Sequence, residues 1–178
     1  MRIVTDRLII RFLTLKDTDD YFEYAKNPNI GPNAGWKPIE NRKIAEKVVA
    51  GLVFRKETYG IILRQNDKLI GTISIYNDTI RKYKKACSIG FSVSEDYQNM
   101  GYATEALKNL IDYIFKYLDY EIIEIGHHVG NYKSKRVIEK CGFYYNGRLD
   151  KFKVLYDGTI IDADFYSLTK EDYMKGNK

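Results

Sequence analysis

Cysteine and proline are scarce in this chain of 178 residues, which has two cysteines, Cys87 and Cys141, and three prolines. Two isolated cysteines cannot build a disulfide framework, and neither stands in a CxxC pair or a Cys/His cluster that would bind zinc. With 44% hydrophobic and 30% charged residues, the composition excludes a collagenous or disordered chain. We therefore expect a globular protein with reduced thiols.

Long apolar runs are also missing. No stretch approaches the roughly 18 apolar residues of a membrane span, and the opening residues 1–6 lack the apolar region of a signal peptide. We therefore expect no membrane partner and a cytoplasmic location. Two nucleotide motifs are absent as well: without GxGxxG after a strand a dinucleotide enzyme is disfavoured, and without GxxxxGK[ST] a P-loop enzyme is disfavoured.

The formal net charge of +5 is compatible with an anionic partner such as nucleic acid, a membrane surface or a phosphorylated cofactor. Lys and Arg form no single block, because Asp and Glu are interspersed with them, and this disfavours nucleic acid. The chain has no internal repeat and no linker, so we expect one domain over 1–178. A homodimer stays open.

Hydrophobic periodicity predicts an α/β chain. Predicted strands lie at 7–13, 60–64, 69–76, 86–93, 121–128, 143–154 and 160–168, and predicted helices at 20–26, 39–55, 103–118 and 133–140. Residues 27–33 are dense in turn formers and are predicted to be a loop. The strand-helix-strand-helix order over 86–140 predicts neighbouring parallel strands, and Asp157-Gly158 predicts a hairpin between the last two strands.

The junction between the strand at 86–93 and the helix at 103–118 is the chemically informative stretch. A helix N-terminus has unpaired N–H groups and partial positive charge, and small residues such as Gly101 and Ala103 let an anion approach it. A phosphate site would use such a junction. An ordinary strand-to-helix turn with Gly at a strained φ explains the same residues.

With Gln98, Gly101 and Ala103 in order, this junction resembles the pyrophosphate loop of the GCN5-related N-acetyltransferase (GNAT) family, which reads Gln or Arg, two residues, Gly, one residue, Gly or Ala. Downstream, Asn131 and Ser134 are similar to the family's Asn-x-x-Ser helix, which ends here in Cys141-Gly142-Phe143.

The resemblance extends over nearly the whole chain. The ends, at 5–11 and 162–168, together with 101–107, look most like the branch that contains the ribosomal-protein N-terminal acetyltransferases (RimJ/RimL type). Spermidine acetyltransferases and some antibiotic-modifying enzymes are similar relatives, so the acceptor stays open.

The resemblance implies a mixed seven-stranded sheet that splays between its fourth and fifth strands and is flanked by about four helices. The implied reaction is direct transfer of an acetyl group from acetyl-CoA, the cosubstrate, to a primary amine of a protein N-terminus, a polyamine or an antibiotic. No metal is implied. A non-catalytic acyl-CoA-binding regulatory protein on the same fold is the alternative.

The family also implies which residues hold the cosubstrate. Strand backbone would pair with the pantetheine arm, loop amides and Thr104 would hold the diphosphate, and Asn131 would bind the pantetheine. The complete cofactor set is Phe91, Ser92, Val93, Gln98, Asn99, Met100, Gly101, Tyr102, Ala103, Thr104, Asn131, Ser134 and Arg136. Arg136, with Lys133 or Lys135, would meet the adenosine 3′-phosphate, unless these cations only form a solvated helix face.

For catalysis, the resemblance assigns Ser134 as the acid to the CoA thiolate, although a helix-surface Ser is the alternative. Ile138 stands where other acetyltransferases carry a Tyr. The Val93 amide is the candidate for polarising the thioester carbonyl, because the strand is expected to bulge there. Many relatives carry a Glu where this chain has Ser88. Glu95 is therefore our candidate base.

Asp162 and Asp164 are the alternative bases. The acceptor pocket is assigned to Trp36, His128, Asp162 and Tyr166, with Trp36 equally suited to anchoring the core. His127 and His128 end a predicted strand, so one of them should face the cleft. Paired histidines also suggest a metal, but no third ligand is nearby in sequence, and we predict none.

Overall fold

The computed structural model describes residues 1–77 and 80–176. The strands are β1 (Arg2–Val4), β2 (Leu8–Phe12), β3 (Thr58–Leu63), β4 (Leu69–Asn77), β5 (Ala86–Val93), β6 (Ile122–His128), β7 (Tyr144–Val154) and β8 (Ile160–Thr169). The α-helices are α1 (Thr18–Ala25), α2 (Gly31–Ala34), α3 (Arg42–Arg55), α4 (Tyr102–Tyr117), α5 (Tyr132–Lys140) and α6 (Lys170–Gly176), and two short 3-10 helices are η1 (Leu15–Asp17) and η2 (Glu95–Tyr97). No helix among these residues is long and apolar enough to cross a membrane.

The strands form one mixed sheet with the order β1-β2-β3-β4-β5-β6-β8-β7. All seven predicted strands are present, and the eighth is β1, whose three residues are too few to show an alternating pattern. The predicted loop at 27–33 was wrong in part, because Gly31 and Pro32 open the short helix α2, which ends at Gly35 in the left-handed region. α6 was not predicted from the sequence.

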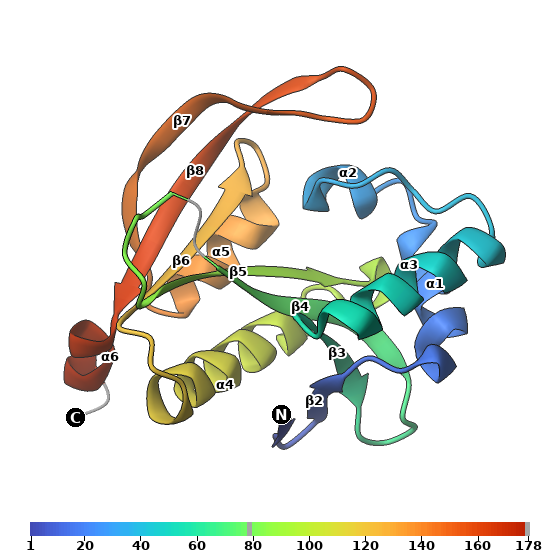
Figure 1. Ribbon diagram of the computed structural model, residues 1–178, viewed down its shortest axis with the longest axis horizontal. Helices are drawn as coiled ribbons and strands as arrows, with labels where there is room; N and C mark the ends of the chain where they lie inside the picture. The colour runs from blue at the N-terminus through green and yellow to red at the C-terminus, as the bar shows by residue number, and fades with distance from the viewer. Residues whose placement is uncertain (78–79, 177–178) are drawn as a thin grey trace. The chain divides into compact units, whose positions relative to one another are not determined.

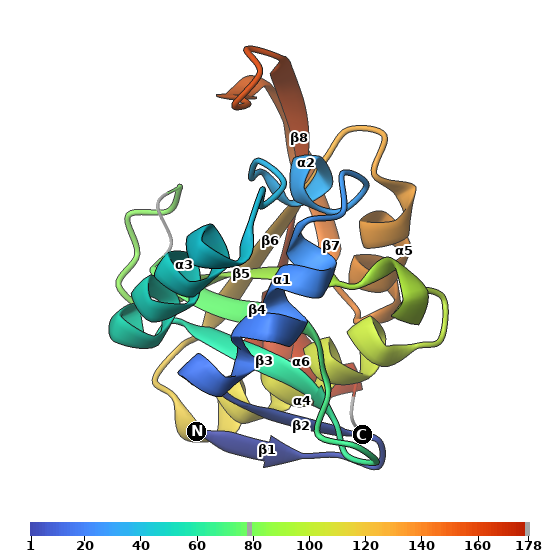
Figure 2. The ribbon, with the colours of Figure 1, turned by 90° about the vertical axis from the view of Figure 1, so that its right-hand side faces the viewer.

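By its internal packing the chain divides into two compact units, residues 1–74 with 91–106 and residues 75–90 with 107–178. The first unit contains the antiparallel pairs β1–β2, β2–β3 and β3–β4. Figure 2 shows β1 running beside β2.

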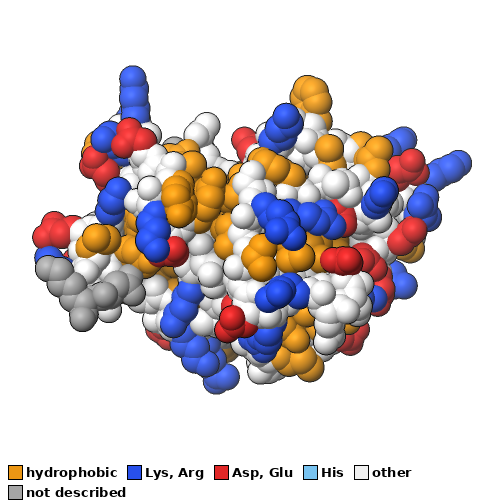
Figure 3. Space-filling model, turned by 90° about the horizontal axis from the view of Figure 1, so that it is seen from below, with side chains coloured by type: hydrophobic (Ala, Val, Ile, Leu, Met, Phe, Trp, Pro, Cys, Tyr) orange, Lys and Arg blue, Asp and Glu red, His pale blue; other side chains and the backbone are white. Residues whose placement is uncertain are grey.

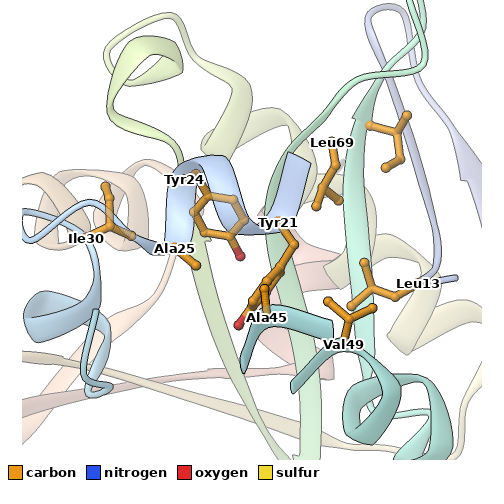
Figure 4. Close-up of a cluster of buried hydrophobic side chains, with 9 residues drawn as sticks. Leu13, Tyr21, Tyr24, Ala25, Ile30, Ala45, Val49 and Leu69 are labelled. Atoms are coloured by element: carbon orange, nitrogen blue, oxygen red, sulfur yellow. The ribbon is translucent and has the colours of Figure 1, made fainter. Parts of the chain in front are cut away.

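The core of the first unit forms where α1 and α3 pack together (Figure 4). On α1, Tyr21, Tyr24 and Ala25 follow the spacing of one helical face and are all buried. Val49 from α3 and Leu13 pack into the same cluster. Burying side chains of this size contributes about 1.5–3 kcal/mol each, which fixes the helices on the strands.

The second unit contains the parallel pair β5–β6 and the antiparallel pairs β6–β8 and β7–β8. The last two strands form the long hairpin at the C-terminal end of the colour range in Figure 1. Gly158, at φ 86, lies in its turn as the Asp-Gly signal predicts.

The pairing of β5 with β6 is short: it covers Ala86–Ile89 and Ile122–Ile125. Beyond these residues β6 continues to pair with β8 as far as His128, while no further pair with β5 follows in the described chain. This is the expected splay between the fourth and fifth predicted strands.

On the face in Figure 3, Lys and Arg are interspersed with Asp and Glu and with hydrophobic side chains. This distribution agrees with the mixed charge order of the sequence.

Candidate active site

In the first unit, the chain leaves β5 at Val93, passes through η2 and enters α4 through a loop with unusual backbone angles. Asn99 has φ 61 and Gly101 has φ 83. Left-handed residues in such a loop turn successive amides toward one side, which favours anion binding. The Glu105 N–H bonds to the Gly101 carbonyl at 2.9 Å, and this bond starts the helix. The amides of Tyr102 and Ala103 therefore stand at a helix N-terminus, where anions are stabilised.

Gln98 was predicted to bind the cosubstrate, and its side chain has a contact within the protein. Its Nε2 donates to the Val93 carbonyl at 3.0 Å, so the side chain closes the loop back onto the end of β5. This bond gives Gln98 a role in shaping the loop.

Arg7, which the sequence did not point to, supports the loop from outside. Its Nη1 donates to the Met100 carbonyl at 2.9 Å, its Nε donates to Glu105 Oε2 at 2.7 Å, and its guanidinium lies 4.4 Å from the centre of the Tyr102 ring. A Cβ built on Gly101 would lie 3.3 Å from Arg7 Nη2. One side chain thus joins the loop to the first turn of α4.

Glu105 completes this support. Its Oε1 accepts from the Thr5 hydroxyl at 2.5 Å and from the Arg7 amide at 3.1 Å. Burial alone would raise the pKa of Glu105, but the hydrogen bonds from Thr5 and Arg7 outweigh it and hold the pKa below its ordinary value. The carboxylate is therefore ionised at neutral pH.

The end of β5 approaches β4 unusually closely. A Cβ on Gly71 would lie 2.2 Å from the Ser92 carbonyl oxygen and 2.9 Å from the Val93 Cα, so only glycine fits there. The next amide, that of Ser94, donates to the Ile70 carbonyl at 2.7 Å. Gly71 therefore fixes the backbone of Ser92 and Val93, which was predicted to bind the donor.

Glu95, the predicted base, is held by amides. Asn27 Nδ2 donates to its Oε2 at 2.7 Å, and Asn29 Nδ2 lies 3.3 Å from Oε1 and 3.2 Å from Oε2. These bonds join η2 to the turn after α1. They give Glu95 a structural part in the first unit.

Trp36 packs against the hydrophobic cluster of the first unit. Its Nε1 is buried and has no hydrogen-bond partner among the described residues. The packing corresponds to the core-anchor alternative, while the indole N–H is a donor that a bound molecule would satisfy.

In the second unit, Asn131 caps α5. Its Oδ1 accepts from the Ser134 N–H at 3.2 Å, so the family's Asn-x-x-Ser spacing is here an N-cap. Ser134 is partly exposed and shares a helix face with Ile138, which is completely buried four residues later. Ile138 is thus a core residue. Arg136 is exposed on the same helix.

The two histidines of β6 are neighbours along the strand and therefore point to opposite faces of the sheet. His127 is buried, and its Nδ1 and Nε2 lie 2.9 Å from the His128 carbonyl and 3.3 Å from the Tyr166 hydroxyl. His128 is half-buried, and desolvation, with Lys153 and His127 nearby, lowers its pKa. Burial, with Asp164 nearby, raises the pKa of Tyr166. Because Tyr166 contacts His127, and His128 points the other way, His128 and Tyr166 lie on different faces of the sheet.

The predicted acidic candidates of β8 already have partners. Asp164 binds the Arg148 guanidinium through both oxygens, at 2.9 and 3.2 Å, and the Arg148 contact holds the pKa of Asp164 below its ordinary value. Asp162 Oδ1 accepts from the Lys151 N–H at 2.8 Å. Both carboxylates therefore stabilise the β7–β8 hairpin.

The structure thus sorts the predicted residues by unit. The first holds Trp36, Phe91, Ser92, Val93, Glu95, Gln98, Asn99, Met100, Gly101, Tyr102, Ala103 and Thr104, and the second holds His128, Asn131, Ser134, Arg136, Asp162 and Tyr166. Among the described residues, no group of three or more His, Cys, Asp or Glu side chains is arranged to hold a metal ion.

Comparison with known proteins identifies the family. A model of the acetyltransferase (GNAT) domain matches residues 7–144. The chain belongs to the GNAT family. It is similar to the uncharacterized N-acetyltransferase YnaD of Bacillus subtilis, at 32% identity over 97% of this chain and 99% of that protein.

The expected branch is also confirmed. The [ribosomal protein uS5]-alanine N-acetyltransferase of Escherichia coli is 25% identical over 99% of this chain and 94% of its own length. Among solved structures, a GNAT-family acetyltransferase from Bacillus anthracis superposes with a TM-score of 0.84 and 25% identity, covering 96% of this chain and 99% of that one. The chain is therefore an acetyltransferase, and its acyl donor is acetyl-CoA.

Proposed function

We propose that this GNAT enzyme moves the acetyl group of acetyl-CoA directly to a primary amine, and that the acceptor is a protein N-terminus, a polyamine or an antibiotic amine. The observation that carries the proposal is the loop before α4, where left-handed Asn99 and Gly101 lead into a helix N-terminus and Arg7 holds the backbone of Met100. This geometry suits the diphosphate of CoA.

Different residues would bind different parts of the cosubstrate. The backbone of Phe91, Ser92 and Val93 would pair with the pantetheine amides, and Asn131 would offer its side-chain amide to the same arm. Arg136, exposed on α5, would meet the 3′-phosphate with its guanidinium.

For the transfer itself, the neutral amine attacks the thioester carbon, a C–N bond forms and the C–S bond breaks. The Val93 N–H would stabilise the developing oxyanion. The Ser134 hydroxyl would give a proton to the departing sulfur and be reprotonated by the proton that the attacking nitrogen loses, so that amide and free thiol are formed. The cap from Asn131 fixes the first turn of α5 and therefore the position of Ser134.

We further propose that both units act as one acetyltransferase domain, because the family match at 7–144 includes residues of each. A protein N-terminus is the acceptor that the similarity to the uS5-alanine acetyltransferase favours. His128 and Trp36 remain our candidates for the acceptor pocket. Asp162 and Tyr166 project from the sheet face opposite to His128, because β6 pairs His128 with Ala163 and Ile125 with Tyr166, so they do not line the same pocket.

The test is release of free CoA thiol from acetyl-CoA in the presence of peptides with N-terminal Ala or Ser, spermidine, and aminoglycoside or streptothricin-type amines. We expect turnover on at least one class, with identification of the acetylated nitrogen by mass spectrometry. Binding of acetyl-CoA without turnover on any of these amines would contradict the proposed acceptors, and failure to bind acetyl-CoA would contradict the donor site.

A further inference from the structure

A buried carboxylate on β6 lies in register with the serine of β5. Glu124 pairs with Ser88 in the parallel ladder, and on its other side it pairs with Ser167 of β8. Directly paired residues on neighbouring strands present their side chains on the same face of a sheet. Ser88, Glu124 and Ser167 therefore form one row across three strands of the second unit.

The row repeats a short sequence on both strands. Ser88-Ile89-Gly90 on β5 stands beside Glu124-Ile125-Gly126 on β6, and the register aligns their first two positions. The side chain missing from position 88 is thus present one strand away, about 4.8 Å in the hydrogen-bonding direction.

Glu124 is only 3% exposed, and its Oε2 lies 3.2 Å from Arg81 Nε. Taking a carboxylate out of water costs several kcal/mol unless a counter-charge compensates, and Arg81 supplies one. The pair places an acidic side chain beside a guanidinium on a sheet face where its row neighbours are serines. A buried carboxylate in register with Ser88 is therefore a candidate for chemistry on this face.

The same face opens immediately beyond Glu124. Gly126, two residues along and on the same side of the strand, is exposed. Its Cα is flanked by the Phe165 ring, since a Cβ there would lie 3.0 Å from that ring. Next to Ile89, a Cβ on Gly90 would lie 3.3 Å from the Tyr76 ring. Glu124 therefore stands at the edge of a face lined by two glycines and two aromatic rings.

We propose that Glu124 is the proton acceptor for the incoming amine, in place of a carboxylate at Ser88. This inference rests on the proposed function, and it selects a cationic primary amine, whose ammonium group the carboxylate and the Tyr76 and Phe165 rings attract.

In the proposed step, an N–H bond of the ammonium breaks and its proton passes through a water to a Glu124 oxygen. The neutral amine then attacks the thioester carbon as described above. After product release, Glu124 returns the proton to solvent, so the net reaction converts ammonium and acetyl-CoA into amide, free CoA thiol and one proton.

The experiment compares Glu124→Gln with wild type on the amine that wild type acetylates fastest, with kcat/KM measured from pH 6 to pH 10. We expect kcat/KM of Glu124→Gln to be about 100-fold below wild type at pH 7, because general-base catalysis contributes on this scale. The difference should become smaller as the pH approaches 10, because an amine that is already neutral needs no base. Acetyl-CoA affinity should not change. Glu121→Gln, which removes an exposed carboxylate of the same region that is paired with Lys85, is the matched control.

Activity of Glu124→Gln within twofold of wild type, or an equal loss at every pH, would overturn the inference. If Glu124→Gln does not fold, the double variant Ser88→Glu/Glu124→Gln tests the proposal instead, because it keeps one carboxylate in the same row of side chains. Activity within tenfold of wild type supports the proposal, and loss of activity with acetyl-CoA binding intact overturns it. Absence of wild-type turnover on every amine would instead count against the proposed function.

Discussion

At the residue scale, Ser134 is the side chain whose chemistry the proposed function uses most directly. It lies in the first turn of α5, held through its own N–H by Asn131. Ser134→Ala removes the hydroxyl and leaves that backbone bond in place. We expect kcat to fall about 100-fold, because protonation of a leaving thiolate is lost, with little change in acetyl-CoA affinity.

The measurement is steady-state kinetics together with acetyl-CoA titration. Tyr132→Phe, two residues earlier and exposed, is the control that should keep wild-type rates. An unchanged kcat in Ser134→Ala would show that the CoA sulfur takes its proton from another source.

The two cysteines give a second prediction at this scale. Burial raises the pKa of Cys141 to about 11, and Cys87 is completely buried. Because the thiolate is the reactive species, we expect both thiols to resist a disulfide exchange reagent at pH 8 in the folded protein and to react in guanidinium. A thiol introduced by Tyr132→Cys should react at once, and comparable reactivity of the native cysteines would contradict their burial.

At the element scale, the contact between the N-terminal segment and α4 organises the cosubstrate loop. Arg7 binds the Met100 carbonyl and Glu105 at once. Arg7→Ala should weaken acetyl-CoA binding about tenfold with a smaller effect on kcat, because it loosens the loop amides without touching the reacting atoms. Arg7→Lys should not restore affinity, since a single ammonium lacks the forked geometry.

Calorimetric titration with acetyl-CoA measures this effect. Arg42→Ala is the matched control, because it also removes an arginine paired with a carboxylate, Asp19, but on α3. Equal affinities of wild type and Arg7→Ala would show that the loop holds its shape without this contact.

The Glu105 carboxylate makes the same contact dependent on pH. Its pKa is held below the ordinary value in the folded protein, so the stabilisation is complete above the unfolded pKa, about 4.3, and is lost as the pH falls through the folded pKa. Glu105→Gln should lower the unfolding free energy by about 1–2 kcal/mol at pH 7 and by much less near pH 3.5. Urea unfolding at both pH values measures the difference, with the exposed Glu171→Gln as control.

The sequence patterns predicted the helices and strands better than they predicted the contacts between distant residues. The apolar stripe of α4 and the Asp-Gly turn of the hairpin are local signals, and both were confirmed. β1 and α2 were not predicted, because elements of three or four residues are too short to show a hydrophobic periodicity. The role of Arg7 was not predictable, since its partner Glu105 lies 98 residues away. The proposed role of Glu124 was not predictable either, because it depends on the pairing of Glu124 with Ser88 on the neighbouring strand.

At the scale of the whole molecule, the two compact units are joined in an unusual way. The boundaries between them fall at Ser74–Ile75, Gly90–Phe91 and Ala106–Leu107, which lie inside β4, β5 and α4. Domain boundaries ordinarily fall in exposed linkers with few contacts. Here each boundary falls inside a regular element, so unfolding one unit alone would have to interrupt a helix and two strands.

We therefore expect the chain to unfold in one cooperative transition. In scanning calorimetry the calorimetric and van 't Hoff enthalpies should agree, as they do for a two-state protein. The heat-capacity change should be about 2.1–2.7 kcal/mol/K, the value for a chain of this length that unfolds completely. Acetyl-CoA at 100 times its dissociation constant should move this transition as a whole, adding about 2.7 kcal/mol. Two resolved transitions, with acetyl-CoA shifting only one, would contradict this prediction. They would show that the units unfold as separate domains, with α4 unfolding in two steps on either side of Ala106.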